Sequence, residues 1–390
     1  MTAASQDEAR RFLSVSRKVK GGGVLHFVRS RLMTAPLHTL VMKIIVVIGT
    51  CGVALSLFLL DQSVRGGTLK QQQNITVLLW HWPFSRAYSL QGDVCRDAYG
   101  VPGCVLTDSR ASFPDADVVV FHHHELKYKR SSLPLHLPRP PAQKWIWLSL
   151  EPPANNGPLS AYDGVFNWTM SYRRDADVPV PYGRLVPRAT ASAPADDQDD
   201  ANADYFVPGN KTHLVCWVVS NYKSRHERSK VYQRLKQVVK VQVYGRWARR
   251  PLSDRDLLPA ISRCHFYLAF ENSQSADYVT EKLWRNSFQA GAVPVVLGPP
   301  RGNYEALAPA DSFVHVDDFK SVEEMAQFLR RLAADGRRYA SYFAWRRRHE
   351  VKLYTDWRER LCQICRHYHS LDPRKVYQDL DSWANGQIVS

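Results

Sequence analysis

The chain has 390 residues, which is enough for two domains with separate hydrophobic cores. Its net charge of +15 at pH 7 indicates an anionic partner, and ten lysines and arginines lie between Lys223 and Arg250 against the single acid Glu227. Nucleic acid is the first such partner to consider, but no nucleic-acid recognition motif accompanies the charge, so we expect a smaller anionic ligand or a solvated helix face.

The N-terminal segment predicts a membrane anchor. Residues 44–60 form a run of 17 residues without a charged side chain, at the short end for a membrane-spanning helix. Eight lysines and arginines precede or adjoin this run against two acids, which places residues 1–43 in the cytosol and the rest of the chain across the membrane. A cleaved signal peptide is the alternative, but the long preceding segment and the lack of a clear cleavage site speak against it. Residues 61–73 form a short polar stem.

Glycosylation sequences and cysteines fit a body that lies in an oxidising lumen. The three candidate glycosylation sites are Asn74, Asn167 and Asn210. Cys95 with Cys104, and Cys362 with Cys365, are plausible disulfide sets. The CxxC at 362–365 could instead be half of a zinc site or a redox pair, but no second such set completes zinc coordination and no thioredoxin-like context surrounds it.

From residue 74 onward, apolar runs alternate with polar or helical segments. Strands are predicted at Ile75–Trp80, Asp117–His122, Trp145–Leu150, His213–Ser220, Val241–Tyr244, His265–Phe270, Val293–Leu297 and Phe313–Val316, and helices at His226–Val239 and Val279–Ala290. Continuous apolar strands separated by helices indicate parallel sheets covered on both faces. A segment without periodicity at 190–202 separates the halves. We therefore expect an α/β fold of two Rossmann-like domains, 74–206 and 207–360, with a cleft between them and a C-terminal segment at 361–390.

Polar residues crowd the region that follows the predicted strand at 265–270. Parallel sheets bind ligands at the carboxyl ends of their strands, and the free N–H groups of a helix start suit a phosphate. Lys282 adds a positive charge there, and Arg228 takes a similar place after the strand at 213–220, where its guanidinium can hold two phosphate oxygens. We expect a phosphate-containing ligand, although both side chains could also be ordinary capping or surface residues.

The run of three histidines and a glutamate at 122–125 suggests a metal site at first sight. In a strand, neighbouring side chains point to opposite faces, so only His122 and His124 would share a side, and two ligands do not make a zinc site. The acidic pairs at 115–117 and 175–177 mimic a metal-binding Asp-x-Asp sequence, but such pairs arise freely. We expect no metal held by the protein.

Several segments together resemble the α-1,3-fucosyltransferases, Golgi enzymes that move fucose from GDP-fucose to a hydroxyl of N-acetylglucosamine. The donor-binding signature of that family is similar to FYLAFENS at 266–273 and DYVTEKLWRNSFQAGAVPVVLGPP at 277–300. Further matching segments lie at 80–84 (WHWPF), 166–168 (FNW), 171–175 (SYRRD), 217–221 (WVVSN), 313–319 (FVHVDDF) and 355–360 (TDWRER). The resemblance runs from about Asn74 to about Trp383, and within the family it points to the leukocyte type that builds sialyl Lewis x.

The resemblance implies the two-domain architecture called GT-B and an inverting transfer of fucose. The donor residues that it implies are Ser220, Asn221, Arg228, Asn272, Tyr278, Glu281 and Lys282. Glu151, which follows the strand at 145–150, matches the family's general base, the group that takes the proton of the attacking hydroxyl. The alternative interpretation of Glu151 is a carboxylate at a strand end that only faces solvent. Direct attack with one base inverts the anomeric centre, so no second carboxylate is needed as a nucleophile.

On the acceptor side, the resemblance singles out His123, His124 and Glu125. The family has His-His-Arg or His-His-Trp here, and the absence of Trp favours the type 2 (Galβ1-4GlcNAc) acceptor, although His124 leaves this open. The expected acceptors are α2,3-sialylated type 2 lactosamine glycans on glycoproteins and glycolipids, with neutral lactosamine as the alternative. We expect an enzyme in the Golgi membrane that needs no cofactor beyond its donor substrate, that manganese at most stimulates, and that has no nucleic-acid partner.

The resemblance also leads one to expect a CxxC shortly before Cys264, and it is absent, so Cys216 and Cys264 are expected to be buried free thiols. Two other classes of function remain open at this point. A catalytically idle, lectin-like or scaffold protein could use the same fold. A metal-dependent transferase for another nucleotide sugar would be stabilised by UDP with manganese, whereas the present interpretation predicts stabilisation by GDP without metal.

Overall fold

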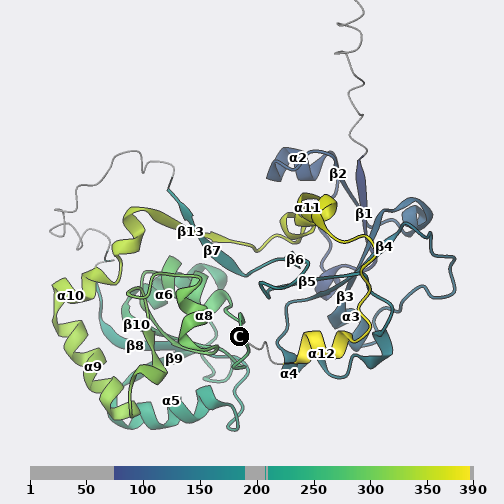
Figure 1. The fold of residues 1–390 in the computed structure, drawn as a ribbon. Coiled ribbons are helices and arrows are strands. Elements are labelled where there is room, and N and C mark those ends of the chain that lie inside the picture. The colour runs from purple at the N-terminus through teal and green to yellow at the C-terminus, as the bar shows by residue number, and fades with distance from the viewer. Residues whose placement is uncertain (1–73, 189–206, 208–209, 387–390) are drawn as a thin grey trace, which may run out of the picture. The chain divides into compact units, whose positions relative to one another are not determined.

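The structure, a computed structural model, describes residues 74–188, 207 and 210–386 (Figure 1). The expected anchor, the stem and the connector at 190–202 lie outside the described residues. Within those described ranges, no helix has both the length and the apolar character needed to cross a membrane.

The first half of the described chain forms a parallel sheet of six strands. The strands are β1 (Ile75–Leu79), β2 (Cys104–Thr107), β3 (Val118–His122), β4 (Lys144–Ser149), β5 (Trp168–Ser171) and β6 (Val178–Pro179), in the order β2-β1-β3-β4-β5-β6. Short helices connect them: η1 (Pro83–Ser85), α2 (Val94–Tyr99), η2 (Arg110–Asp115), α3 (His123–Lys127), α4 (Pro153–Asn156) and η3 (Ser160–Tyr162). The three strands predicted in this half are confirmed, each with slightly shifted ends.

The second half forms a parallel sheet of five strands. These are β8 (His213–Val218), β9 (Val241–Tyr244), β10 (Cys264–Phe270), β11 (Val293–Leu297) and β12 (Val314–His315), in the order β12-β11-β10-β8-β9. The helices of this half are α5 (Glu227–Val238), α6 (Asp254–Ser262), α7 (Glu281–Leu283), η5 (Trp284–Gln289), α8 (Arg301–Glu305), η6 (Val316–Asp318), α9 (Val322–Ala334), α10 (Gly336–Ser341) and η7 (Ala344–Arg347). The expected alternation of apolar strands and helices is confirmed.

Alternating side chains on the central strands give each sheet a core on both faces. In the second sheet, Phe266 and Leu268 pack with α5 and α9 on one face, whereas Tyr267 and Ala269 pack with η5 on the other. In the first sheet, Val118 and Val120 belong to one core and the intervening Val119 to the opposite one. Both sheets are therefore buried on two sides, as their continuous apolar strands predict.

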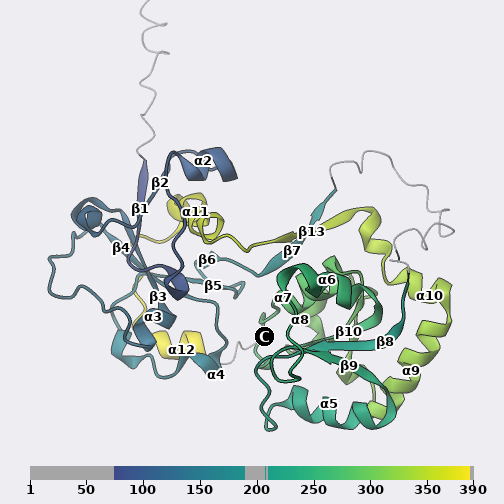
Figure 2. The same cartoon turned by 180° about the vertical axis from the view of Figure 1, so that it is seen from behind.

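The C-terminal part of the chain returns to the first sheet (Figures 1 and 2). It leaves the second half through β13 (His349–Leu353), which pairs antiparallel with β7 (Gly183–Pro187). The helix α11 (Trp357–His367) then contributes to the core on one face of the first sheet, η8 (Tyr368–Ser370) follows, and α12 (Leu380–Asn385) contributes to the core on the other face. The first sheet is therefore complete only when the end of the chain is in place.

The cysteine pairing differs from the expected one. The disulfides join Cys95 to Cys362 and Cys104 to Cys365, so the CxxC does not close on itself. Both cysteines lie on α11, three residues apart and therefore on one side of the helix. From that side, Cys362 bonds to a cysteine of α2 and Cys365 to a cysteine of β2.

Two further sequence predictions are corrected. Cys216 and Cys264 are paired as a disulfide, so the expectation of free thiols is wrong. Asn167 is only 6% exposed, and its side chain accepts a hydrogen bond from the Trp145 N–H and donates one to the Lys375 carbonyl. A glycan on Asn167 would break these bonds, and the structure therefore argues against glycosylation there, whereas Asn74 and Asn210 are exposed.

Candidate active site

Four of the expected donor residues follow the carboxyl ends of β8 and β10, and two of them, Arg228 and Asn272, line one pocket. Ser220 and Asn221 follow β8 and are exposed, and Asn272 follows β10. Arg228 lies in the first turn of α5 and is only 6% exposed. A pocket of about 180 Å³ is bordered by His226, Glu227, Arg228, Glu271, Asn272, Ser273, Gln274 and Leu297. A polar pocket with a buried arginine thus lies where parallel sheets bind ligands.

Arg228 connects the two strand ends. Its Nη2 donates to the Asn221 carbonyl at 2.5 Å and its Nη1 to the Phe270 carbonyl at 3.4 Å. Its Nε has no hydrogen-bond partner among the described residues. Burial lowers the pKa of the guanidinium, and the nearby carboxylate of Glu271 opposes that shift. The alternative of an ordinary surface arginine is therefore wrong, and a buried cation is available to an anion in the pocket.

A buried ion pair forms the centre of this region. The Lys282 Nζ lies 2.9 Å from the Glu271 Oε2, 2.7 Å from the Thr280 Oγ1 and 3.1 Å from the Glu281 Oε1. Burial raises the pKa of Glu271. For Lys282, burial alone would lower the pKa, but the carboxylates of Glu271 and Glu281 raise it, so the amine stays protonated. Thr280 fixes the arrangement, because its N–H and its hydroxyl both donate to the Glu271 Oε1 at 2.8 Å.

Sequence reasoning did not include Glu271 among the donor residues. It is the first polar residue after β10, and that position at the carboxyl end of a buried strand was the signal that could have identified it. The structure makes it the principal partner of Lys282 and leaves Glu281 about half exposed, with 48% of its side chain accessible.

Tyr278 links the two halves of the chain. Its ring is buried and lies 5.1 Å from the Tyr172 ring, after β5, and 6.3 Å from the Tyr182 ring, before β7. Burial raises the pKa of Tyr278 well above its ordinary value, and the carboxylates of Glu271, Glu151 and Glu281 add to the shift. The phenol is therefore neutral, and carboxylates of both halves contribute to keeping it so.

A charged contact joins the same segments. The Asp277 Oδ1 accepts hydrogen bonds from the Arg174 Nε and the Asn303 Nδ2, both at 2.8 Å. Asp277 has a left-handed backbone conformation with a φ of 60°, which few residues other than glycine adopt. These contacts hold the start of the donor segment against the segment that follows β5.

Glu151 follows β4 and is partly exposed. Its Oε2 accepts a hydrogen bond from the Asn155 Nδ2 at 2.7 Å. The Tyr182 hydroxyl donates to the carbonyl of the preceding Leu150 at 2.8 Å, and the same tyrosine packs on Tyr278. The candidate base and the donor segment are therefore connected through one side chain.

The histidine segment is not a continuous strand, because α3 begins at His123. Glu125 is fully buried and accepts hydrogen bonds from the His122 Nδ1, from the His124 Nδ1 at 3.2 Å and from the Phe84 N–H at 2.8 Å. Burial alone would raise the pKa of Glu125, but these histidine contacts lower it to about 2. Of the other expected acceptor residues, Glu125 therefore holds His124, together with His122 and Phe84, which sequence reasoning did not place with them.

His123 points elsewhere, since its Nε2 lies 2.9 Å from the Asn156 carbonyl. No group of three or more side chains suited to hold a metal ion occurs in the part of the chain that the structure describes. The acid pair at 175–177 serves structure: Asp175 binds Arg173, and Asp177 binds Lys375 and the Thr169 N–H.

Comparison with known proteins gives matches over most of the chain. Residues 208–383 match the family described as "Glycosyltransferase family 10 (fucosyltransferase) C-term", and residues 72–183 match "Fucosyltransferase, N-terminal". The chain is 47% identical over 336 residues to alpha-(1,3)-fucosyltransferase 7 of Rattus norvegicus, covering 86% of each chain, and 48% identical over 328 residues to that of Homo sapiens, covering 84% of this chain and 91% of the human one.

A second group of relatives and one solved structure also match. The chain is 41% identical over 308 residues to 4-galactosyl-N-acetylglucosaminide 3-alpha-L-fucosyltransferase 9 of Bos taurus, covering 79% of this chain and 81% of that one. The crystal structure of an alpha1,3-fucosyltransferase with GDP-fucose has a TM-score of 0.50 at 17% identity and covers 80% of this chain and 94% of its own. At that identity the likeness supports the fold, two parallel sheets of GT-B type.

Proposed function

The chain belongs to glycosyltransferase family 10, the fucosyltransferases, and from this premise we propose that it transfers L-fucose from GDP-β-L-fucose to the 3-hydroxyl of N-acetylglucosamine in α2,3-sialylated lactosamine, forming sialyl Lewis x. It is an enzyme of the α-1,3-fucosyltransferase type, as its relatives are. The observation that carries the proposed mechanism is the contact between the two halves, where Tyr182 touches both Tyr278 of the donor segment and the residue before Glu151.

The donor diphosphate carries negative charge that grows on the leaving oxygen as the bond to fucose breaks. Arg228 and Lys282 supply two cations from the start of α5 and from α7. Lys282 faces two carboxylates, so its charge is held in place and partly balanced before the donor binds. We propose that the diphosphate lies against Arg228 and Lys282, and that Glu281 and Tyr278 make hydrogen bonds to its sugars, in keeping with a donor such as the GDP-fucose of the solved relative.

Glu151 is the proposed general base. Its carboxylate is partly exposed, so an acceptor hydroxyl can reach it, and Asn155 holds one of its oxygens while the other is free to accept a proton. A single base with direct attack inverts the anomeric centre, so a β-linked donor gives an α-linked product. No step of this mechanism requires a protein-held metal.

The preference for a sialylated acceptor is the finer part of the proposal. It is supported by 47–48% identity to the relatives named alpha-(1,3)-fucosyltransferase 7, against 41% for the relative named fucosyltransferase 9, and by the net charge of +15. An anionic acceptor gains from a positive field around the site. We further propose a Golgi membrane location with the catalytic part in the lumen, from the apolar run at 44–60 and the charges before it.

An acceptor panel tests this function. The full-length protein is assayed with GDP-fucose and four acceptors, namely type 1 and type 2 lactosamine, each with and without α2,3-linked sialic acid. We expect the highest kcat/KM on sialylated type 2 lactosamine, and we expect its advantage over the neutral acceptor to shrink as the salt concentration rises. A higher kcat/KM on neutral lactosamine at low salt would contradict the sialyl Lewis x assignment, and no transfer to any of the four would favour an idle lectin-like protein.

A further inference from the structure

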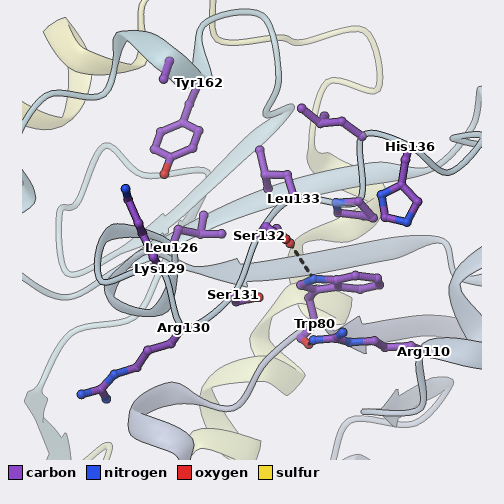
Figure 3. A pocket seen from close by; sticks show the side chains of 13 residues that line it. Trp80, Arg110, Leu126, Lys129, Arg130, Ser131, Ser132, Leu133, His136 and Tyr162 are labelled. Atoms are coloured by element: carbon purple, nitrogen blue, oxygen red, sulfur yellow. Dashed lines mark hydrogen bonds between the residues drawn. The ribbon is translucent and has the colours of Figure 1, made fainter.

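A cavity in the first half of the chain shares no lining residue with the donor pocket (Figure 3). Its volume is about 720 Å³, within the range of about 300–1,000 Å³ that ligand sites span. It is lined by the loop that follows α3, by residues of η2 and η3, and by Trp80, which directly follows β1. The side chains on which the inference rests are Trp80, Arg110, Lys129, Arg130, His136 and Tyr162.

The lining is basic and contains no acid. The Arg110 guanidinium lies 4.4 Å above the Trp80 ring. Lys129, Arg130 and His136 are exposed, and none of them forms an ion pair with a carboxylate of another described residue. Lys129 has a left-handed backbone with a φ of 52°, and its N–H donates to the Leu126 carbonyl at 3.1 Å, which fixes the direction in which its side chain leaves the chain. A concave surface with unpaired cations attracts an anion.

The same lining presents aromatic and apolar surface. The Trp80 Nε1 donates to the Ser132 carbonyl at 2.9 Å, so the ring is held in place (Figure 3). The Tyr162 hydroxyl forms no hydrogen bond to another residue in the described ranges and is available to a ligand. Leu135, with 71% of its surface exposed, and Tyr128, with 57%, border this segment. A wall that is mainly apolar and carries a few polar groups is typical of a small-ligand site. It suits a ligand with both apolar and polar surface, as a sugar has.

The short helix α3 connects this cavity to the candidate base. Leu126 of α3 lines the cavity, and the adjacent Lys127 donates from its Nζ to the Asn155 carbonyl. Asn155 in turn holds the Glu151 carboxylate. On the other side of α3, the Arg130 N–H donates to the Glu125 carbonyl at 2.9 Å. The helix α3 therefore contributes both to the wall of the cavity and to the hydrogen bonds that lead to Glu151.

We propose that this cavity binds the acidic sugar of the acceptor glycan, a saccharide that carries a carboxylate or a sulfate, while the sugar that receives fucose lies at Glu151. The proposal rests on the proposed function, because it assigns a place to the acidic part of that acceptor. Lys129 and Arg130 contribute the charge, Arg110 on Trp80 sets the floor, and Tyr162 offers a hydrogen bond. Nothing in this arrangement takes part in the transfer itself, so these residues are specificity-determining and not catalytic.

The test measures binding separately from catalysis, with the full-length protein. The probes are 3′-sialyllactose, lactose 3′-sulfate and neutral lactose, titrated by saturation-transfer NMR in the absence of donor. The variant Lys129→Gln/Arg130→Gln is compared with Arg255→Gln/Arg337→Gln, two exposed arginines of the second half that remove the same charge. We expect the first variant to weaken binding of both acidic saccharides about tenfold, the scale of one charge-assisted contact, and the matched control to stay within about twofold of wild type.

Kinetics provide the second readout. With sialylated lactosamine, Lys129→Gln/Arg130→Gln should raise KM about tenfold and leave kcat within about twofold, whereas both parameters for neutral lactosamine should stay unchanged. If that variant does not fold, Tyr162→Phe, which removes only a hydroxyl, replaces it, with an expected loss of about threefold in acidic-saccharide binding.

Three outcomes would overturn the assignment of the cavity. Equal losses in the pocket variant and in the control variant would mean that the effect is one of net charge. Unchanged binding of both acidic saccharides in the pocket variant would mean that they bind elsewhere, even if the enzyme prefers sialylated acceptors. Binding to vesicles of anionic lipid that the pocket variant loses, together with no binding of any saccharide, would mark a membrane contact. A preference for neutral acceptors in the wild type would contradict the proposed function alone, because the saccharide titration still decides the cavity.

Discussion

Replacing Lys282 by methionine tests two roles of the Glu271–Lys282 pair separately, its contribution to the stability of the fold and its proposed contribution to donor binding. Glu271 has 1% of its side chain exposed and Lys282 has 16%, so water screens the pair only weakly. The substitution preserves the unbranched apolar stem of the side chain and removes the charged amine, together with its bond to the Thr280 hydroxyl. The Glu271 carboxylate then remains buried with only the Thr280 contacts.

The magnitude follows from that burial. Removing one partner of a buried ion pair costs about 3–5 kcal/mol, because the other charge stays desolvated without compensation. Glu271 has a raised pKa already and can take up a proton, which limits the loss, so we expect about 3 kcal/mol for Lys282→Met. The double variant Glu271→Gln/Lys282→Met removes the buried charge as well, and we expect it to regain about 2 kcal/mol of the free energy of unfolding.

The assay combines unfolding with binding. Urea unfolding, followed by tryptophan fluorescence, gives the free energy of unfolding of wild type, of Lys282→Met, of Glu271→Gln and of the double variant. Titration with GDP-fucose gives the affinity of each folded protein. We expect the double variant to recover most of its stability and none of its donor affinity, because the diphosphate needs the Lys282 charge, which glutamine and methionine do not restore.

Either of two results would refute this reasoning. A double variant no more stable than Lys282→Met would show that Glu271 does not carry an uncompensated charge. Wild-type affinity for GDP-fucose in the stable double variant would show that Lys282 serves the fold and not the donor.

Three further predictions concern the other residues of the site and the fold. Glu151→Gln should retain GDP-fucose binding and lower kcat at least about a hundredfold, and a kcat within a few-fold of wild type would remove Glu151 from the mechanism. Burial lowers the pKa of His123 to about 4 from 6.5, so the unfolded chain binds the extra proton between these values, and stability should fall by up to about 3 kcal/mol as the pH drops from 6.5 to 4. In urea unfolding, His123→Gln should flatten that dependence of stability on pH, and the exposed control His136→Gln should not. The same pH dependence in both variants would contradict the role of His123. Cys95→Ser/Cys362→Ser should lower the free energy of unfolding by about 2–5 kcal/mol, and a non-reducing peptide map that links either cysteine to another partner would contradict the pairing.

Local sequence pattern was sufficient for most of the secondary structure and for the donor segment. The strands at Val241–Tyr244 and Val293–Leu297 have the predicted bounds. Val293–Leu297 is an uninterrupted apolar run that is buried throughout, as a strand between two helix-covered faces is, whereas Val241–Tyr244 is a partly buried strand at the edge of the sheet. Lys282 and Arg228 are identified by similar reasoning, since both lie at the start of a helix that follows a strand of the parallel sheet, on the side of its ligand-binding edge.

Pattern was insufficient where neighbours in space decide the local conformation. The helix predicted at 279–290 is instead α7 and the π-helix η5, and it begins only after Thr280, whose hydroxyl lies near both the Lys282 N–H and the Glu271 carboxylate. The histidine run was read as a strand, but the chain turns into α3 at His123, and Glu125 is held there by Phe84, 41 residues away in sequence. Neither partner is visible in a window of a few residues.

The largest difference between sequence and structure lies at the end of the chain. From the sequence, Cys362 and Cys365 form one short motif, and residues 361–390 are a terminal segment that is assigned to neither domain. In the structure, each cysteine bonds to a residue more than 260 positions earlier, and α11 and α12 contribute to the cores on opposite faces of the first sheet. The sequence determined which segments are apolar and which carry charge near strand ends, because those properties depend on neighbours along the chain. Only the tertiary structure decided which distant segments bury that apolar surface and which carboxylate faces Lys282, because both depend on contacts that close long loops.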